Sequence, residues 1–347
     1  MSALQSLVEE VSNSLPYIPS SQNFWLNRTN DGAYYDLFKE KKIVGLKIDE
    51  ITLFELSQIR DRNLLRNGRP NRDVIQIEIK NIVHEKNKKR LLKIVDKSKR
   101  SAELARLTMT ANQIFHFAFG IKKGDFVVIP SASSTEISIG RIDDGYLDDN
   151  QFLPLQRKVT WLGSYPKITL DPNFYRLFFS QQALTEINKY KDVVLRTLYD
   201  FYFDDEYGHL VFNVGTLSKI NAVDEAAFNF YFLQLLDGFI KENNLPYDVT
   251  SLNTIVNLNS PGKRKLFGPR TTIFLAACLL LMTVGGGLEH KKGTFSLKTE
   301  GILQGWSEYL NQKKRREIVD EVINKSDSLS IEKQKLFLEL LETLDSK

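Results

Sequence analysis

Five short segments between residues 23 and 163 have the composition of β-strands, and their density is the strongest constraint on the fold. They are either continuously apolar or alternate apolar with polar residues, and turn-forming residues separate them. Closing such strands into a barrel removes open sheet edges, so we expect a small barrel or a strongly bent sheet. The predicted strands span residues 23–29, 43–48, 126–130, 136–142 and 157–163.

Two helices are expected between these strands. The first, AYYDLFKEKK at 33–42, follows the turn-forming Asn-Asp-Gly. The second begins near Ser101, where apolar residues recur at spacings of three and four as far as Phe119. Gly120 follows in the usual position after a helix end. Lys-Lys-Gly-Asp then leads directly into the strand at 126–130, so we expect the aromatic residues of this helix to pack on the barrel.

Positive charge is concentrated between Arg60 and Arg106. That stretch holds 15 Lys or Arg residues against six Asp or Glu, although the net charge of the whole chain is only +4. A local excess of this kind indicates a polyanionic partner. A solvated, partly disordered insertion is the alternative interpretation. The stretch also contains an apolar alternation, VIQIEI at 74–79.

The C-terminal half is expected to be mixed but mainly helical. The segment 207–215 predicts a strand, Asp224–Lys241 predicts an apolar helix, and 249–262 alternates until Ser-Pro-Gly. A short strand at 292–299 and amphipathic helices at 303–323 and 331–344 are expected to follow. The fold class is therefore α+β. The predicted divisions are an N-terminal extension at 1–20, a first domain at 21–165, a helical connector at 166–205 and a second domain at 206–347.

Residues 271–288 form an uncharged segment whose length lies between two classes of helix. A membrane-spanning helix needs about 20 apolar residues, whereas runs of about 10 to 14 are usually buried in a core. Lys263–Lys265 and Arg270 precede the segment, as basic residues do at the cytoplasmic end of a membrane helix. A buried helix, at an oligomer interface for example, and a membrane segment both remain open. The single cysteine, Cys278, lies within this segment and excludes an intramolecular disulfide.

Several motifs of the first half, taken in order, resemble the N-terminal PUA-like domain of Mrr-type restriction proteins and related prokaryotic defence proteins. The C-terminal half carries no such resemblance. The matching residues near the start are Trp25, Arg28, Gly32, Asp36, Phe38, Lys41 and Ile43–Gly45. Those further on are Asn112, Gln113, Phe115, Phe117, IKKGDFVVIP at 121–130, IGRI at 139–142, Arg157, Val159, Trp161, Leu162 and Gly163.

The resemblance implies a small barrel that binds nucleic acid, because the wider PUA, EVE and YTH group does so and many members hold a flipped base. Such a base needs an aromatic slot and polar groups for its Watson–Crick edge. The base-pocket candidates are Trp25, Asn27, Thr29, Asn112, Phe115, Ser131, Ser133 and Trp161. The phosphate-contact candidates are Arg60, Arg62, Arg66, Arg69, Arg72, Lys86, Lys88, Lys89, Arg90 and Lys93.

Catalytic motifs are not evident. Mrr proteins carry a nuclease domain with acidic metal ligands and an acid-x-Lys pair, and the nearest lookalike here is Asp73 with Glu78–Lys80. The turn Asp204–His209 contains metal-ligand types, but an exposed acidic turn is the preferred interpretation. No Gly-rich phosphate loop or nucleophile–base arrangement is present. We therefore expect no cofactor and favour a non-enzymatic protein, with a cryptic nuclease as a further hypothesis.

Two main hypotheses follow. In the first, the chain is a sensor of DNA, with RNA still open, in a prokaryotic antiviral defence or restriction-type system. Its barrel would detect a modified or displaced base, and its C-terminal domain would be the oligomerisation or effector module, as a homo-oligomer or with a protein partner. In the second, it is a membrane-associated effector whose barrel binds a nucleotide or a protein and whose segment 271–288 inserts. Residues 1–20 lack the features of a signal peptide, so a cytoplasmic location is expected under the first.

Overall fold

The computed structural model describes residues 17–67, 71–143, 153–180, 182–214, 222–256, 262–284, 309 and 313–328. The chain divides into two compact units, Ser21–Val194 and a second that joins Leu195 onward with the residues up to Ser20. Most of the predicted connector at 166–205 therefore belongs to the first unit. The reason is that strand β6 (Leu184–Glu186) pairs with β1, with Glu186 opposite Trp25.

The N-terminal unit is built on a six-stranded sheet with the order β2-β5-β4-β3-β1-β6, which curls into half a barrel. Only β1 and β3 run parallel, and every other neighbouring pair is antiparallel. All five strands predicted for this half are present. Their bounds are β1 Phe24–Asn27, β2 Ile43–Leu46, β3 Phe126–Pro130, β4 Glu136–Ile142 and β5 Leu155–Pro166. An irregularity between Ile139 and Gly140 shifts the register of β4 against β5 and bends the sheet.

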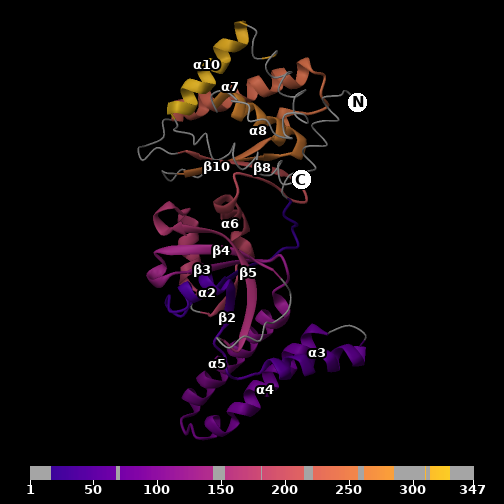
Figure 1. Ribbon diagram of the computed structural model, residues 1–347, viewed down its shortest axis with the longest axis vertical. Helices are drawn as coiled ribbons and strands as arrows, with labels where there is room; N and C mark the ends of the chain where they lie inside the picture. Colours follow the sequence, from indigo (N-terminus) through magenta and orange to yellow (C-terminus); the bar gives the residue numbers. More distant parts are fainter. Residues whose placement is uncertain are drawn as a thin grey trace. The chain divides into compact units, whose positions relative to one another are not determined.

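The basic stretch folds into an arm of three helices that extends away from the strands of this unit (Figure 1). They are α3 (Leu53–Asn67), α4 (Arg72–Leu92) and α5 (Lys97–Phe115). The apolar alternation at 74–79 lies in α4, because its buried positions, Ile75, Ile79 and Val83, recur every four residues. The described part of the stretch is thus helical, and the alternative of a partly disordered insertion does not apply to it.

The helix-to-strand stretch at 111–130 is formed as predicted, with one addition. After α5 the chain makes a π-helical turn, His116–Gly120, and then enters β3. The guanidinium of Arg157, fully buried, donates from Nε to the carbonyl of Phe117 at 3.0 Å and from Nη2 to that of Ala118 at 2.9 Å. This side chain satisfies carbonyl groups that a helix end leaves without partners. Phe117 of the turn is buried in the core and Phe119 packs against it, as expected.

The C-terminal unit contains a four-stranded antiparallel sheet with the order β7-β8-β10-β9. Helix α8 packs against β8 and β10. Figure 1 shows α8 and the other two helices of the unit, α7 and α10, on the same side of the sheet. The strands are β7 Phe201–Phe203, β8 Gly208–Val214, β9 Asn253–Val256 and β10 Gly262–Gly268. The helices are α7 Ala222–Glu242, α8 Arg270–Val284 and α10 Lys313–Ser328. The α+β class is therefore confirmed. The predicted elements at 292–299 and 331–344 lie outside the described residues.

The apolar segment forms helix α8, which is a buried helix, the first of the two interpretations. Its residues from Ile273 to Leu280 are buried in the core of the unit, and burial raises the pKa of the Cys278 thiol to about 12. Across the described residues, no helix has the combined length and apolar content needed to cross a membrane. Residues 285–288 of the predicted segment lie outside the described part of the chain.

The comparison of Lys263–Lys265 with the basic residues that flank a membrane helix was wrong. This cluster lies in β10, a central strand between β8 and β9, and the side chains of Arg264 and Lys265 are buried there. Arg264 lies 3.5 Å from the carboxylate of Glu225 on α7. A buried charge of this kind is tolerated when it is paired. Sequence patterns treat Lys and Arg as exposed, so β10 was not predicted.

Candidate functional site

The N-terminal unit contains a pocket of about 510 Å³ at the end of β1. The ends of β1, β2 and β3 and the turns that follow them form its walls. Its lining residues are Arg28, Thr29, Asn30, Asp31, Gly32, Tyr34, Gly45, Leu46, Lys47, Ile48, Pro130, Ser131, Ser134 and Ala183. A hollow of this volume is within the range of small-molecule and nucleotide sites.

Two tight turns form one side of the pocket. Asn30, Asp31 and Gly32 have positive φ angles of 53°, 54° and 90°, and Ser134 on the second turn has a φ of 53°. A Cβ atom on Gly32 would lie 2.4 Å from the backbone nitrogen of Ala132. The two turns therefore touch at a point where only glycine fits, and this contact sets the shape of the pocket.

Asn27 fixes the wall behind the pocket. Its side chain is fully buried, and its amide nitrogen donates to the carbonyl groups of Gly45 and Ala183, each at 3.2 Å. Both acceptors line the pocket, one on β2 and one just before β6. One amide thus ties together three segments that are distant in sequence, so Asn27 is a positioning residue and not a lining residue.

The chemical groups at the pocket are an aromatic ring, two cations, a carboxylate and several hydroxyls. The ring of Tyr34 is half-buried and stacks on Phe38, with centroids 5.9 Å apart and planes at 18°. The Arg28 guanidinium donates from Nη2 to the carbonyl of Phe178 at 3.1 Å, which fixes its position. Lys47 and Asp31 are exposed. The arrangement suits a planar, polar ligand that carries negative charge, because stacking, hydrogen bonds and ion pairing are all available.

The structure brings together only some of the predicted base-pocket residues. Thr29 and Ser131 line the pocket, and Ser133 lies on the same turn as Ser131. The hydroxyl of Thr29 donates to the carbonyl of Pro130 at 2.5 Å, which joins β1 to β3. The sequence analysis did not select Tyr34 or Lys47, although the turn-forming Asn-Asp-Gly beside Tyr34 was a usable signal.

The other predicted pocket residues lie elsewhere in the unit. Trp25 is buried in the core, and its indole N–H donates to Asp125 at 2.9 Å. Trp161 packs against the same core and donates to the carbonyl of Phe38 at 3.1 Å. Phe115 is buried, and Asn112 accepts a hydrogen bond from Gln76 at 3.0 Å within the arm. These side chains stabilise the unit and are not among the pocket-lining residues.

The predicted phosphate-contact residues lie on the arm, and most are exposed. Arg60, Arg62, Arg72, Lys86, Lys88, Lys89, Arg90 and Lys93 are all exposed. Arg69 lies outside the described residues, and the side chain of Arg66 is not described. Arg72 lies over the ring of Phe115, 5.5 Å from its centroid. Several others form ion pairs with carboxylates of the arm, which distinguishes them from the cations that have no such pair.

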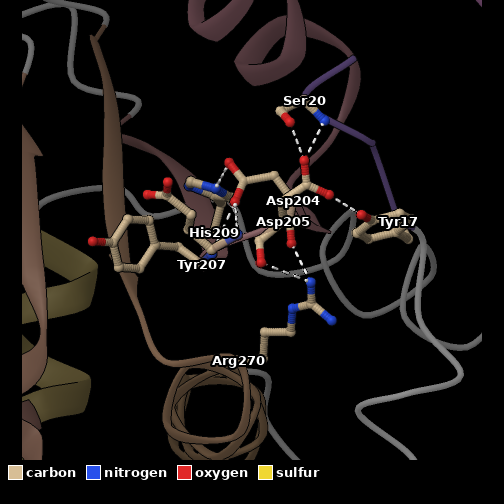
Figure 2. Close-up of polar contacts among 8 residues, drawn as sticks. Tyr17, Ser20, Asp204, Asp205, Tyr207, His209 and Arg270 are labelled. Carbon is tan, nitrogen blue, oxygen red and sulfur yellow. Dashed lines mark hydrogen bonds and ion pairs between the residues drawn. The ribbon is translucent and has the colours of Figure 1, made fainter. Parts of the chain in front are cut away.

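The acidic turn at 204–209 in the C-terminal unit is used internally (Figure 2). Asp204 accepts from the Nε2 of His209 at 2.8 Å and from the backbone N–H of Tyr207 at 2.8 Å. Asp205 accepts from the hydroxyls of Tyr17 and Ser20 and so holds the segment that leads into the first unit. The described residues contain no group of carboxylates, histidines and cysteines that could hold a metal ion. The exposed acidic turn that the sequence predicted describes Asp205 and Glu206, whereas Asp204 is half-buried and His209 is buried.

Asp204→Asn is expected to lower the melting temperature at pH 7, with a difference from wild type that shrinks below about pH 4. Burial opposes ionisation of Asp204, but hydrogen bonds from His209, Tyr207 and Glu206 hold its pKa well below the usual value. A carboxylate with a lowered folded pKa stabilises the fold above its unfolded pKa and loses this contribution as the pH falls through the folded value. Thermal unfolding between pH 3 and 7 tests this. A difference that stays constant, or an equal pH effect in the control Glu206→Gln, would contradict it.

The nuclease lookalike does not have the geometry of a metal site. Asp73 and Glu78–Lys80 all lie on helix α4, whereas the nuclease arrangement places its acids on neighbouring strands. Glu78 accepts a hydrogen bond from the Nη2 of Arg62 at 3.2 Å. Glu78 therefore takes part in the contact of α3 with α4, and Asp73 and Glu78–Lys80 do not form the two-strand arrangement that the nuclease hypothesis required.

Comparison with known proteins gives one match. Residues 63–188 are similar to a family described as a domain of unknown function, DUF8426. The matched part begins within α3 and ends just after β6, so it includes α4, α5 and strands β3 to β6 but neither β1 nor β2. It thus covers the turn at 131–134 of the pocket and most of the arm. No curated protein and no solved structure matches the chain.

Proposed function

We propose that the chain binds nucleic acid, with DNA as the first candidate and RNA as the second, and holds one displaced or modified base in the pocket of the N-terminal unit. The observation that carries this proposal is the presence, in one compact unit, of a pocket with stacking and hydrogen-bonding groups and an arm rich in exposed cations. Phosphate contacts supply affinity and pocket contacts supply selectivity.

Tyr34 is the residue best suited to stack on such a base. Tyr34 is one of the pocket-lining residues, and its ring stacks on Phe38, so the position of the ring is held before a ligand binds. The hydroxyls of Ser131 and Ser134 and the amide of Asn30 are candidates for contacts with a base edge. Arg28 and Lys47 are candidates for the attached phosphate.

The resemblance of residues 23–163 to the first domain of Mrr-type proteins supports a place in a prokaryotic antiviral defence or restriction-type system. In this proposal the N-terminal unit is PUA-like and acts as a cytoplasmic sensor. The C-terminal unit serves as the oligomerisation or effector module, and its own sheet and hydrophobic core support treating it as a separate module. Its proposed partners are further copies of the chain or another protein of the system.

Binding of the full chain to labelled duplexes, measured by fluorescence anisotropy between 50 and 200 mM salt, tests this function. The set comprises an unmodified duplex, the same duplex with one methylated or hydroxymethylated cytosine, one with a single unpaired base, and the RNA equivalent. We expect binding that weakens with salt and is tightest for one of the altered duplexes. An absence of binding to all of them at 50 mM salt would overturn the proposal.

Tyr34→Ala is expected to weaken binding of the preferred duplex by about 5- to 150-fold, since stacking of a base on an aromatic side chain contributes roughly 1–3 kcal/mol. Tyr34→Phe keeps the ring and is expected to bind within about threefold of wild type. Phe179→Ala removes an exposed ring outside the pocket-lining residues and serves as the matched control. Equal losses in Tyr34→Ala and Phe179→Ala would contradict the assignment of Tyr34.

A further inference from the structure

The turn that joins α4 to α5, together with the helix ends on either side of it, forms a surface that we call the arm tip: Lys89, Leu92, Lys93, Val95, Lys97 and Lys99. Leu92 is 67% exposed and Val95 is 90% exposed. The four lysines surround these two aliphatic side chains along the sequence, and all four are exposed. The arm tip thus presents two exposed aliphatic side chains together with four exposed cations.

The arm tip has a fixed shape. The side chain of Asp96 accepts from the backbone N–H groups of Ser98 at 2.8 Å and Lys99 at 3.1 Å, which caps α5. Arg100 donates from Nε at 3.0 Å and from Nη2 at 2.7 Å to the carbonyl of Ile94, which closes the turn from its other side. The lysines and the two aliphatic residues are therefore presented on a preorganised turn.

The cations of the arm fall into two groups. The first group forms ion pairs along the three helices, and we call it the root group: Lys86 lies 2.7 Å from Glu55, Arg62 lies 3.2 Å from Glu78, and Arg106 lies 2.9 Å from Glu103. Arg60 is paired with Asp61, and Arg90 with Glu103. By contrast, Lys89, Lys93, Lys97 and Lys99 have no carboxylate within ion-pair distance among the residues that the structure describes. The four lysines of the arm tip are thus exposed and without an ion pair in the described part of the arm, as Lys80 on α4 also is.

We propose that the arm tip is the element that contacts the nucleic-acid backbone, with its four lysines on phosphates and with Leu92 and Val95 packed into the minor groove against a base step. This inference rests on the proposed function and says which surface performs it. Lysines that lack internal partners can neutralise phosphates without breaking an existing ion pair. Aliphatic side chains pressed into the minor groove unstack a base step and bend the duplex.

An anionic membrane is the other partner that such a surface suggests, and the amount of apolar surface argues against it. Leu92 and Val95 together offer fewer carbon atoms than one myristoyl chain, which by itself gives only marginal membrane binding. A duplex requires less apolar contact, because phosphate neutralisation supplies most of the affinity. The nucleic-acid backbone therefore fits the composition of the arm tip better.

The test compares two full-length variants of equal charge. The tip variant is Lys89→Gln, Lys93→Gln, Lys97→Gln and Lys99→Gln, and the root variant is Arg60→Gln, Arg62→Gln, Lys86→Gln and Arg106→Gln. The logarithm of the association constant for duplex DNA is measured against the logarithm of the salt concentration. Each phosphate contact contributes about 0.9 to the slope, so the tip variant should lose roughly three to four and the root variant less than about one.

A second arm of the test concerns the aliphatic pair. Leu92→Ser with Val95→Ser is expected to leave the salt slope unchanged and to reduce the bend of a duplex labelled at both ends, measured by energy transfer. Circular dichroism is expected to show the same helix content in all variants, because the substituted side chains are exposed.

The outcomes separate this inference from the proposed function. If the wild type binds DNA and the tip and root variants lose equal slope, the inference is wrong and the proposed function stands. If the wild type binds no nucleic acid, the proposed function fails. Loss of binding to vesicles of anionic phospholipid in the tip variant, with an unchanged DNA slope, would overturn the inference in favour of a membrane surface.

Discussion

Gly32→Ala is expected to destabilise the N-terminal unit by about 2–5 kcal/mol and to abolish selective binding in the pocket. Gly32 has a φ of 90°, a conformation that costs an L-residue roughly 1–2 kcal/mol. The added methyl group would also lie 2.4 Å from the backbone nitrogen of Ala132, and overpacking of this kind costs about 1–3 kcal/mol. Because the contact joins the two turns of the pocket, relief of the clash must move a pocket wall. Urea unfolding and duplex binding measure the two effects.

Gly124→Ala is the matched control for this prediction. Gly124 has nearly the same φ, 88°, but a methyl group there would meet only the end of the Gln22 side chain, which can move. It should therefore cost about 1–2 kcal/mol through backbone conformation alone and leave pocket binding intact. Equal effects of the two substitutions on both stability and binding would show that the contact with Ala132 is not important.

Asp125→Ala is expected to destabilise the same unit by about 2–5 kcal/mol. The buried carboxylate accepts from the Trp25 indole N–H at 2.9 Å and from the backbone N–H groups of Asn23 at 3.0 Å and Lys122 at 2.9 Å. Truncation leaves three donors without their acceptor, and each unsatisfied buried group costs roughly 1–3 kcal/mol, less where water can enter. Urea denaturation followed by circular dichroism measures the loss.

Asp125→Asn provides the comparison, because it keeps the shape of the side chain and one of its two acceptor oxygens. It is expected to cost about 1–3 kcal/mol, less than alanine, since a neutral acceptor makes weaker hydrogen bonds than a carboxylate. If the alanine variant were as stable as the asparagine variant, the hydrogen bonds of Asp125 would not be what holds β1 to the turn before β3.

The local elements of the N-terminal unit could be predicted from the sequence because each depends on neighbouring residues. Alternation with a period of two identified β4, and spacings of three and four identified α5. The Asn-Asp-Gly turn was recognised from residues that tolerate positive φ angles, and the structure has such angles at Asn30, Asp31 and Gly32. The strand β10 was missed because Arg264 and Lys265 are buried in it, and the carboxylate that pairs with Arg264, that of Glu225, is far away in the sequence.

The candidate site could be predicted only in part, for the same reason. Thr29 and Ser131 were selected and line the pocket, but they lie on two turns that are about a hundred residues apart in the sequence. Trp25 and Trp161 were selected as aromatic residues for a base, yet each donates its indole N–H to an acceptor inside the unit. A sequence shows that a tryptophan needs such an acceptor and does not show whether the fold provides one.

The sequence by itself determined the α+β class, most strands and helices, and the excess of positive charge between Arg60 and Arg106, because periodicity, turn residues and charge are properties of the local chain. The tertiary structure decided where that charge is available. Cross-helix pairs such as Lys86 with Glu55 neutralise cations of the root group, and the lysines of the arm tip have no acid within reach among the described residues. Pairs between neighbours in the sequence, such as Arg106 with Glu103, follow from helix spacing, whereas pairs between helices, such as Lys86 with Glu55, depend on the packing of α3 on α4.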